Sequence, residues 1–422
     1  MSHQQRQPVL LSPVRHGLIF LFACAVIASR RPDAIFHAQF YAEDGHVWFA
    51  DAYNLGWWPA LFRTWTGYFL TLPRLGASLA LLVPLSRVPL LLNLLAISIH
   101  ALPVNLLLAS RSSEWGSFRF RGLLAGMYLA LPNSTEVSFG ITDANFLLAL
   151  STVILILACP PQTNREKALD VLVIVLCGVS GPFCIFLLPV SLFLAWKRGH
   201  AWHRVQAAIL ASCCAVQSWA LLFLAPAARA HRVLGASPGL LARILGSQVY
   251  LGALLGSNGL STLSSRWLSL TLVCVAIVGT TFVCICFLKA PMPLKIFLVF
   301  AVALFASSLI SPVEWGRPDV PVWAVLAGSP GHRYWFFPTL SFAWSLLFCL
   351  QSKPPILKVL AGYLVLIMCF GIVRDWRHRA FQETQFSASV QRFEAAPAGS
   401  IVTIQEYPQG WDMKLIKRSS KR

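Results

Sequence analysis

The sequence predicts an all-α protein with about eleven transmembrane helices, further helices at the outer membrane surface and a small β-hairpin at the carboxyl end. Its 422 residues are 57% hydrophobic and only 12% charged, which leaves too little polar surface for a soluble protein of this size. Several apolar runs reach the roughly 17–25 residues that a helix needs to cross a bilayer. Short basic loops separate these runs, as is typical of polytopic membrane proteins.

The first apolar segment, roughly Leu18 to Ser29, follows Arg6, Arg15 and His16 and has some features of a signal peptide. The residues after it, RRPDAIF, lack a small-x-small cleavage pattern, so we expect a retained membrane anchor. Ten further spanning helices of about 20 residues are expected. They lie at 88–110, 120–132, 144–160, 168–179, 182–196, 205–225, 267–288, 295–311, 336–350 and 355–373.

Basic clusters predict which loops face the cytoplasm, because loops rich in Lys and Arg are retained on that side. They lie at 111–121, 164–167, 197–204, 289–295 and 353–358. The turns opposite them are expected outside the cell, and they include a long stretch from about Pro226 to Arg266. The amino terminus is then inside and the carboxyl terminus outside.

The segment 69–84 is apolar enough to cross the membrane, and hydropathy alone does not decide whether it does. A crossing there would place all five basic clusters outside, against the positive-inside rule. We therefore expect 55–65 and 69–84 to be juxtamembrane helices in the outer interface, where Trp57, Trp58 and Trp65 suit the depth.

Two parts of the chain are expected. Residues 1–373 form the transmembrane domain, with 30–87 as its first outer loop, and residues 374–422 form an extracytoplasmic tail. In the tail, SIVTIQEY and WDMKLI alternate around PQG, which predicts a short hairpin. A lone hairpin is marginal in water, so it should pack on the outer loops.

The net charge of +18 raises the question of a nucleic-acid partner. The basic residues are spread over many loops and no RNA- or DNA-binding motif is present, so topology and anionic membrane lipid explain the charge and nucleic acid is not expected. The 11 cysteines lie in or beside apolar stretches without zinc spacing, so neither a disulfide framework nor a metal site is predicted.

Acidic residues concentrate in the first outer loop, in the segment FYAEDGHVWF. Aromatic neighbours should raise the pKa of Glu43 and Asp44, which suits a general base for a hydroxyl group. Gly45 would let the backbone approach a ligand closely. The alternative is that EDG only forms a helix cap or turn.

The next outer loop, STEVSFGITDANF, holds Glu136 and Asp143, and Asp143 precedes an apolar run as a helix N-cap would. Asp143 could serve as cap and as site residue. A third candidate segment is GHRYWFFP, in which His332, Arg333 and Tyr334 stand at the outer end of a helix. Arginine offers bidentate donors to phosphate, whereas the alternative is a simple interfacial anchor.

This arrangement resembles the GT-C superfamily of membrane glycosyltransferases, which includes protein O-mannosyltransferases, the lipid A aminoarabinose transferase and oligosaccharyltransferases. YAEDG at 41–45 resembles the acidic motif of their first outer loop, and 55–84 their juxtamembrane helices. Asp143 or Glu136 matches their second acidic position. A group of bacterial multi-spanning proteins resembles it further, through AEDG, the Arg333–Tyr334 pair and GWDMKL at 410–415.

The resemblance also has departures. Many members carry a large soluble outer domain, and none is expected within these 422 residues. Where the bacterial group has an Asn-rich, Trp-containing run after the second outer loop, this chain reads ITDANFLLAL.

The resemblance implies a glycosyltransferase of the bacterial plasma membrane, acting on the extracytoplasmic side. A hexose or pentose would pass from a polyprenyl-phosphate donor to a hydroxyl of a cell-envelope glycan, lipid or protein. We expect Asp44, with Glu43 as second choice, to act on the acceptor, and Asp143 or Glu136 to position acceptor or sugar. Arg333, with His332 and Tyr334 and with Arg232 or Arg243, would bind the lipid phosphate.

No cofactor is certain. A divalent metal would need these carboxylates to converge, and no ligand set in the sequence requires one. Two other classes of function stay open: a transporter or flippase of a lipid-linked or anionic substrate, and a non-catalytic membrane protein. A transporter predicts ionisable residues within helices, for which Asp170 is the candidate.

Overall fold

The structure, a computed structural model, describes residues 12–138, 140–224, 232–262, 268–313 and 319–419. Within these residues, seven helices are long and apolar enough to cross a membrane. They are Pro13–Arg30, Leu85–Leu108, Ala201–Phe223, Pro238–Leu260, Leu270–Lys289, Met292–Ile310 and Pro355–Asp375. This agrees with an integral membrane protein built of helices, while the number of crossings stays a prediction.

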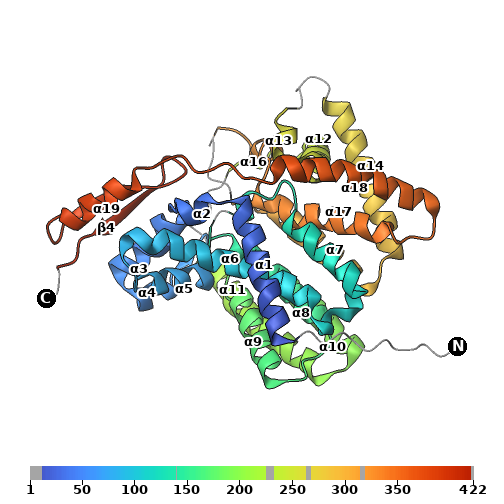
Figure 1. The fold of residues 1–422 in the computed structure, drawn as a ribbon, viewed down its shortest axis with the longest axis horizontal. Coiled ribbons are helices and arrows are strands. Elements are labelled where there is room, and N and C mark those ends of the chain that lie inside the picture. The colour runs from blue at the N-terminus through green and yellow to red at the C-terminus, as the bar shows by residue number, and fades with distance from the viewer. Residues whose placement is uncertain (1–11, 139, 225–231, 263–267, 314–318, 420–422) are drawn as a thin grey trace.

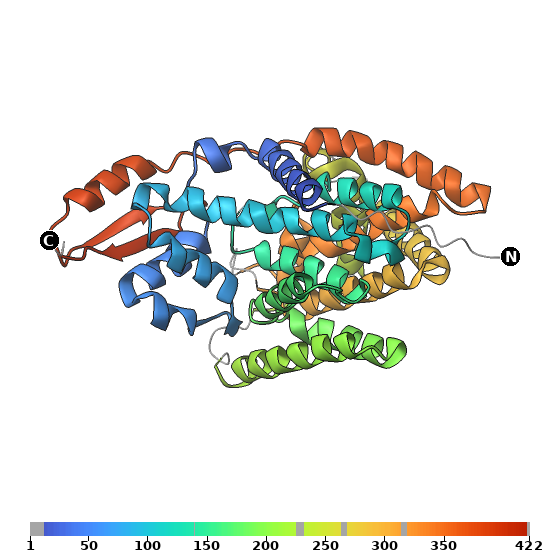
Figure 2. The same ribbon diagram turned by 60° about the horizontal axis from the view of Figure 1, so that its bottom comes forward.

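Each of the eleven expected spans corresponds to a helix. These are α1 (Pro13–Arg30), α6 (Val88–Leu108), α7 (Phe118–Leu129), α8 (Ala144–Leu157), α9 (Asn164–Gly178), α10 (Phe183–Arg198), α11 (Ala201–Phe223), α14 (Leu268–Lys289), α15 (Met292–Ile310), α17 (Phe336–Cys349) and α18 (Pro355–Asp375). Figures 1 and 2 show them packed into one bundle, with the first-loop helices and the carboxyl-terminal hairpin at one end. We call this end the loop end.

Local sequence explains where these helices begin and end. The α9 helix begins at a capping box, in which the Thr163 hydroxyl accepts from the Glu166 amide and the Glu166 carboxylate accepts from the Thr163 amide. The α10 helix ends at Gly199, which has φ of 63°, a conformation that favours glycine. The α8 helix is apolar on every side and is buried along almost its whole length, because it lies between α6, α9 and α10.

The expected outer loop at 226–266 is instead helical over its described central part. It contains α12 (Pro238–Arg243), the π-helix η5 (Ile244–Leu251) and α13 (Gly252–Leu260). Glycine and serine at 252–261 obscure the helical pattern in the sequence. Two hydrogen bonds hold the described part: the Val322 amide donates to the Val233 carbonyl, and the Ser257 amide donates to Asp375 at the end of α18.

The first loop forms a compact group of short elements. They are α2 (Asp33–Phe36), the π-helix η1 (Asp44–Phe49), α3 (Ala50–Leu55), α4 (Trp57–Leu61), β1 (Thr64–Trp65), β2 (Tyr68–Phe69) and α5 (Thr71–Ala80). The α5 helix covers most of 69–84 but has only 10 residues, too few to cross a bilayer. It also buries Arg74, which pairs with Asp51 at 3.0 Å. Trp57 and Trp58 on α4 are exposed, as an interfacial position requires.

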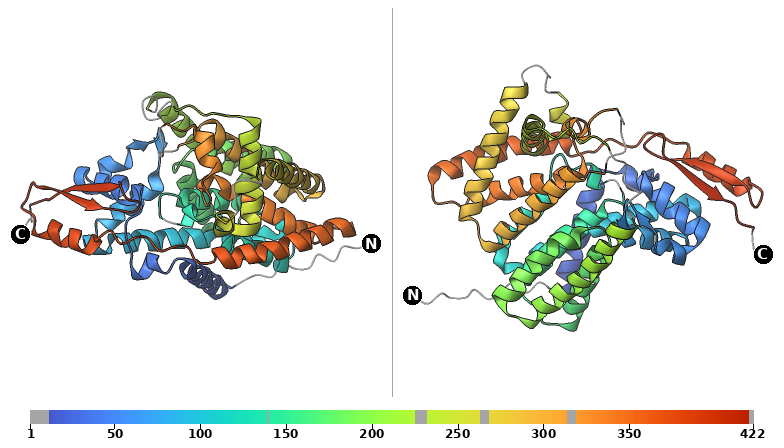
Figure 3. Two further views of the ribbon diagram at one scale, coloured as in Figure 1. Left: turned by 90° about the horizontal axis from the view of Figure 1, so that it is seen from above. Right: turned by 180° about the vertical axis from the view of Figure 1, so that it is seen from behind.

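The tail contains α19 (Phe386–Ala395) and the predicted hairpin, in which β3 (Ile401–Gln405) pairs antiparallel with β4 (Asp412–Ile416). The hairpin packs on the first loop, as the three views in Figures 1 and 3 show. The Ala42 amide donates to the Tyr407 carbonyl at 2.7 Å, and Asn54 on α3 bonds to the backbone of β4 at both Lys414 and Ile416. The remaining short elements are η2 (Leu85–Arg87), η3 (Ser110–Trp115), η4 (Glu136–Ser138), α16 (Val322–Ala327) and η7 (Arg333–Trp335).

Candidate functional site

Two cavities meet at the loop end of the bundle. One, the polar cavity, has a volume of about 700 Å³ and is lined by the first, second and last loops and by the tail. The other, the apolar cavity, has a volume of about 330 Å³ and lies between the helices. Both are lined by Glu43, Asp143, Val313 and Arg333, so the two cavities share these four residues as their common boundary.

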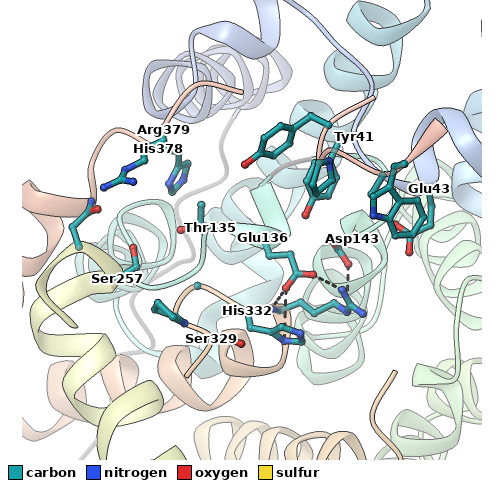
Figure 4. A pocket seen from close by; sticks show the side chains of 18 of the residues that line it. Tyr41, Glu43, Thr135, Glu136, Asp143, Ser257, Ser329, His332, His378 and Arg379 are labelled. Carbon is teal, nitrogen blue, oxygen red and sulfur yellow. Dashed lines mark hydrogen bonds and ion pairs between the residues drawn. The ribbon is translucent and has the colours of Figure 1, made fainter. Parts of the chain in front are cut away.

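Arg333, at the start of η7, is the central cation of this boundary. Its guanidinium forms an ion pair with Glu136, its Nε lies 3.9 Å from Asp143 Oδ1, and its amide donates to Glu136 Oε2 at 2.6 Å. Figure 4 shows Glu136, Asp143 and His332 gathered on one side of the polar cavity. Three segments distant in sequence therefore meet here, as the sequence predicts for Glu136, Asp143 and Arg333.

The two acids beside Arg333 respond differently to burial. Burial alone would raise the pKa of Glu136, but the Arg333 guanidinium and His332 hold that pKa below its ordinary value. Burial raises the pKa of Asp143 well above its ordinary value, because Arg333 is farther away and Glu136 and Glu43 add negative charge. Asp143 precedes α8 as expected, but its side chain makes no capping hydrogen bond. It faces Arg333 and both cavities instead.

Glu43 is the acid of this group that keeps its carboxylate available. It lines both cavities, and within the described residues no hydrogen bond or ion pair ties it to another side chain. Burial raises the pKa of Glu43 although Arg333 opposes the shift.

Asp44, the first choice for the catalytic base, lies elsewhere. Its buried carboxylate lines neither cavity and accepts from the Ile141 amide at 3.2 Å, the Thr142 amide at 3.1 Å and the Thr142 hydroxyl at 2.6 Å. Burial raises the pKa of Asp44 to about 7. The residue therefore ties the first loop to the second, directly before Asp143. Gly45 allows the tail to approach the first loop closely, because a Cβ there would lie 2.5 Å from the carboxylate of Glu406.

Two neighbours of Arg333 in the GHRYW segment are fixed at the cavities, and the Tyr334 ring centroid lies 5.4 Å from the Arg333 guanidinium carbon. The Tyr334 hydroxyl accepts from the Val313 amide at 2.7 Å and lies on the apolar cavity. His332 lines the polar cavity and packs its ring on Tyr334, with 4.5 Å between ring centroids.

Arg232 and Arg243 are not brought to this site. The Arg232 guanidinium donates to the Val320 carbonyl at 3.1 Å, and Arg243 is exposed near the end of α12. Neither lines the polar or the apolar cavity. Of the three arginines expected to bind a lipid phosphate, Arg333 lines both cavities, and the roles expected for Arg232 and Arg243 stay predictions.

The apolar cavity is lined by four helices of the bundle together with loop residues such as Trp65, Tyr68 and Leu70. Its lining includes Phe146 of α8, Phe183 and Phe186 of α10, Leu221 of α11 and Leu304 of α15. Such an apolar surface is suited to a hydrocarbon chain. The charged residues of the boundary lie where this cavity meets the polar cavity.

The sequence predicts that the hairpin packs on the outer loops, but it does not indicate that the hairpin and the residues after α18 line this cavity. Tyr407, Pro408 and Trp411 from the hairpin line the polar cavity, as do Arg377 and Arg379. The alternating pattern predicts the hairpin itself, but no local signal tells which loop it covers.

Asp170, the ionisable residue that the transporter hypothesis singled out, forms an ion pair at the opposite end of the bundle. Arg111 binds it through two contacts of 3.0 and 2.7 Å, and the Trp202 indole donates to it at 3.1 Å. Within the described residues, no group of three or more His, Cys, Asp or Glu side chains could hold a metal ion.

No protein-family model matches the sequence, and no curated protein matches it. Among solved structures, the chain is similar to the archaeal oligosaccharyltransferase AglB from Archaeoglobus fulgidus, in complex with an inhibitory peptide and a dolichol-phosphate. The TM-score is 0.45 and the identity 12% over 90% of this chain, which spans 58% of the length of that protein. At this level of similarity, the roles of individual residues rest on the geometry of this chain.

Proposed function

We propose that this chain is a glycosyltransferase of the bacterial plasma membrane that transfers a sugar from a polyprenyl-phosphate donor to an acceptor hydroxyl on the extracytoplasmic side. One observation carries the proposal. Arg333 and the Glu43 carboxylate stand at the boundary between an apolar cavity among the helices and a polar cavity under the loops. A lipid-linked sugar has a matching order of parts: a hydrocarbon chain, then a phosphate, then a sugar.

In this proposal the isoprenoid chain occupies the apolar cavity. Each buried methylene contributes about 0.8 kcal/mol, so a chain of many such units is retained by the membrane and by this cavity together. The donor phosphate then reaches Arg333. Its charge grows as the bond to the sugar breaks, and a fixed guanidinium stabilises that change. Glu136 and Tyr334 hold Arg333 in position.

Glu43 acts on the acceptor, in preference to Asp44. The acceptor oxygen forms a bond to the anomeric carbon, its proton passes to the Glu43 carboxylate, and the bond from that carbon to the phosphate oxygen breaks. Polyprenyl phosphate leaves with the electron pair, and no redox partner is needed. A raised pKa makes Glu43 a stronger base than an exposed carboxylate. Asp143 lies beside Arg333 and positions the sugar, while Asp44 fixes the loop that carries Asp143.

The test is Glu43→Gln in the full chain, purified in nanodiscs and supplied with polyprenyl-phosphate hexoses or pentoses that carry a radiolabelled sugar. Release of polyprenyl phosphate and transfer of label to a membrane extract are measured. We expect a loss of about 100-fold or more, with normal protein yield. Wild-type activity should also fall as the pH drops through the raised pKa of Glu43, because the base must be ionised.

The matched control is Glu394→Gln, which changes an exposed glutamate on α19 and should leave the rate unchanged. Full activity of Glu43→Gln would exclude the catalytic role. Movement of intact donor across the membrane without cleavage would favour a flippase.

A further inference from the structure

We infer that the polar cavity selects an acceptor that carries an anionic group, phosphate or carboxylate, and binds that group at Arg377 and Arg379. The inference rests on the proposed function, since it names the class of acceptor that the same site takes. Both arginines line the polar cavity after the end of α18. They are separate from Arg333, which lies at the boundary with the apolar cavity.

The charges on the polar cavity are separated in space. Its acids are Glu43, Glu136 and Asp143, and all three lie around Arg333. Figure 4 shows Arg379 and His378 across the cavity from Glu43 and Asp143. Arg333 is thus paired with acids, whereas no ion pair joins Arg379 to an acid among the described lining residues.

The acid nearest to Arg377 in the sequence already accepts hydrogen bonds from other groups. Asp375, two residues before Arg377, is buried and accepts hydrogen bonds from the Asn133 amide, the Ser257 amide and hydroxyl, and the Asn258 amide. Within the described residues, no ion pair joins Arg377 or Arg379 to any carboxylate. Both side chains are exposed toward solvent and the cavity, so their donors are available to a ligand.

Arginine favours this interpretation because its planar guanidinium binds phosphate or carboxylate through two parallel hydrogen bonds. Trp411, from the hairpin, lines the same cavity and offers a flat apolar surface to a sugar ring. An acceptor whose hydroxyl lies at Glu43 could therefore place a ring beside Trp411 and its anion at Arg377 and Arg379. A donor phosphate at Arg333 would leave these two arginines unused.

The experiment measures binding to the purified full chain in nanodiscs of neutral phosphatidylcholine. The probes are methyl glucoside 6-phosphate and its neutral parent methyl glucoside, titrated by calorimetry. We expect only the phosphorylated sugar to bind, and the double variant R377A/R379A to bind it at least about tenfold more weakly, because two charge-assisted contacts are lost. The matched control is Arg374→Ala, an exposed arginine on α18 that does not line the polar cavity.

A second set of nanodiscs contains phosphatidic acid, to separate a glycan phosphate from a lipid headgroup. In one outcome, the wild-type protein loses sugar-phosphate binding in these nanodiscs, while R377A/R379A binds the sugar phosphate equally weakly in both kinds of nanodisc. The lipid then competes at the two arginines, which places the anion on a lipid acceptor and supports the inference. Equal binding of both sugars, or unchanged binding by R377A/R379A, would overturn it.

Cleavage of the donor in water is measured in parallel and separates the two proposals. Cleavage by the wild-type protein together with equal binding of the two sugars would overturn the inference alone. Absence of cleavage by the wild-type protein would instead count against the proposed function, whatever the sugars show.

Discussion

Two adjacent carboxylates in the first loop have different environments, because η1 begins between them. Glu43 precedes the helix and faces both cavities, whereas Asp44 is its first residue and points into the second loop. A carboxylate that accepts three hydrogen bonds from fixed protein groups has little freedom to accept a proton from a substrate. Position relative to the helix start, rather than residue type, therefore separates the structural acid from the candidate base.

The buried state of Asp44 predicts a pH-dependent stability. Its pKa in the folded protein is about 7, above the ordinary value of 3.8, so folding takes up a proton between these values. The contribution of this carboxyl to stability is therefore greatest below about pH 4 and falls as the pH rises to about 7. Asp44→Asn should remove this dependence, which amounts to roughly 2–3 kcal/mol between pH 5 and 7.5. Thermal unfolding of both proteins across this range measures it.

Thr142→Val provides the control for this prediction. It keeps the carboxyl but removes the hydroxyl that donates to Asp44 at 2.6 Å and favours the ionised form. The fall in stability should then extend to higher pH than in the wild-type protein. Identical pH profiles for wild type and Asp44→Asn would show that Asp44 does not change its ionisation on folding.

At the scale of elements, the hairpin depends on the first loop for its position. A two-stranded hairpin is marginal by itself, and its buried residues, Ile404, Met413 and Leu415, pack against the rest of the hydrophobic core. Asn54 forms two hydrogen bonds to the backbone of β4, one at 2.8 Å and one at 2.9 Å. The wall of the polar cavity that contains Trp411 is therefore held by contacts from α3.

Asn54→Ala should loosen the hairpin without unfolding the bundle. Loss of the two hydrogen bonds costs about 1–2 kcal/mol of docking free energy, which raises the open population by roughly 5- to 30-fold. Limited proteolysis should cut the chain between 396 and 412 faster by that factor, and hydrogen exchange should increase in β3 and β4 alone. Asn105→Ala, which changes an asparagine of α6 at the opposite end of the bundle, is the control. Faster exchange throughout the bundle would contradict a local role.

At the scale of the whole molecule, the sequence predicts what depends on local pattern. Apolar length located the helices that form the bundle, and alternation located β3 and β4. The helix at 238–260 escaped because Gly252, Gly256 and Ser257 resemble loop residues. Their small size has a packing reason, since a Cβ at Gly256 would lie 2.4 Å from the Asp375 carboxyl.

The sequence predicted those residues of the site that stand in recognisable short motifs. Glu43, Glu136, Asp143 and Arg333 stand in short motifs, and the structure brings them together. The choice between Glu43 and Asp44 depends on contacts between segments 97 and 98 residues apart, and the position of Arg377 at the same cavity depends on still more distant contacts. No local pattern in a single sequence encodes such a contact.

The arrangement of the whole molecule predicts which end faces the cell exterior. Lys414 on β4 is exposed at the loop end, and Lys167 in α9 is exposed at the opposite end, within one of the basic clusters. In intact spheroplasts, a membrane-impermeant maleimide should label Lys414→Cys, while Lys167→Cys should need permeabilisation. Because the chain has 11 cysteines, the unsubstituted protein gives the background. The reverse pattern would place Glu43 and Arg333 on the cytoplasmic face, where a donor presented outside could not reach them.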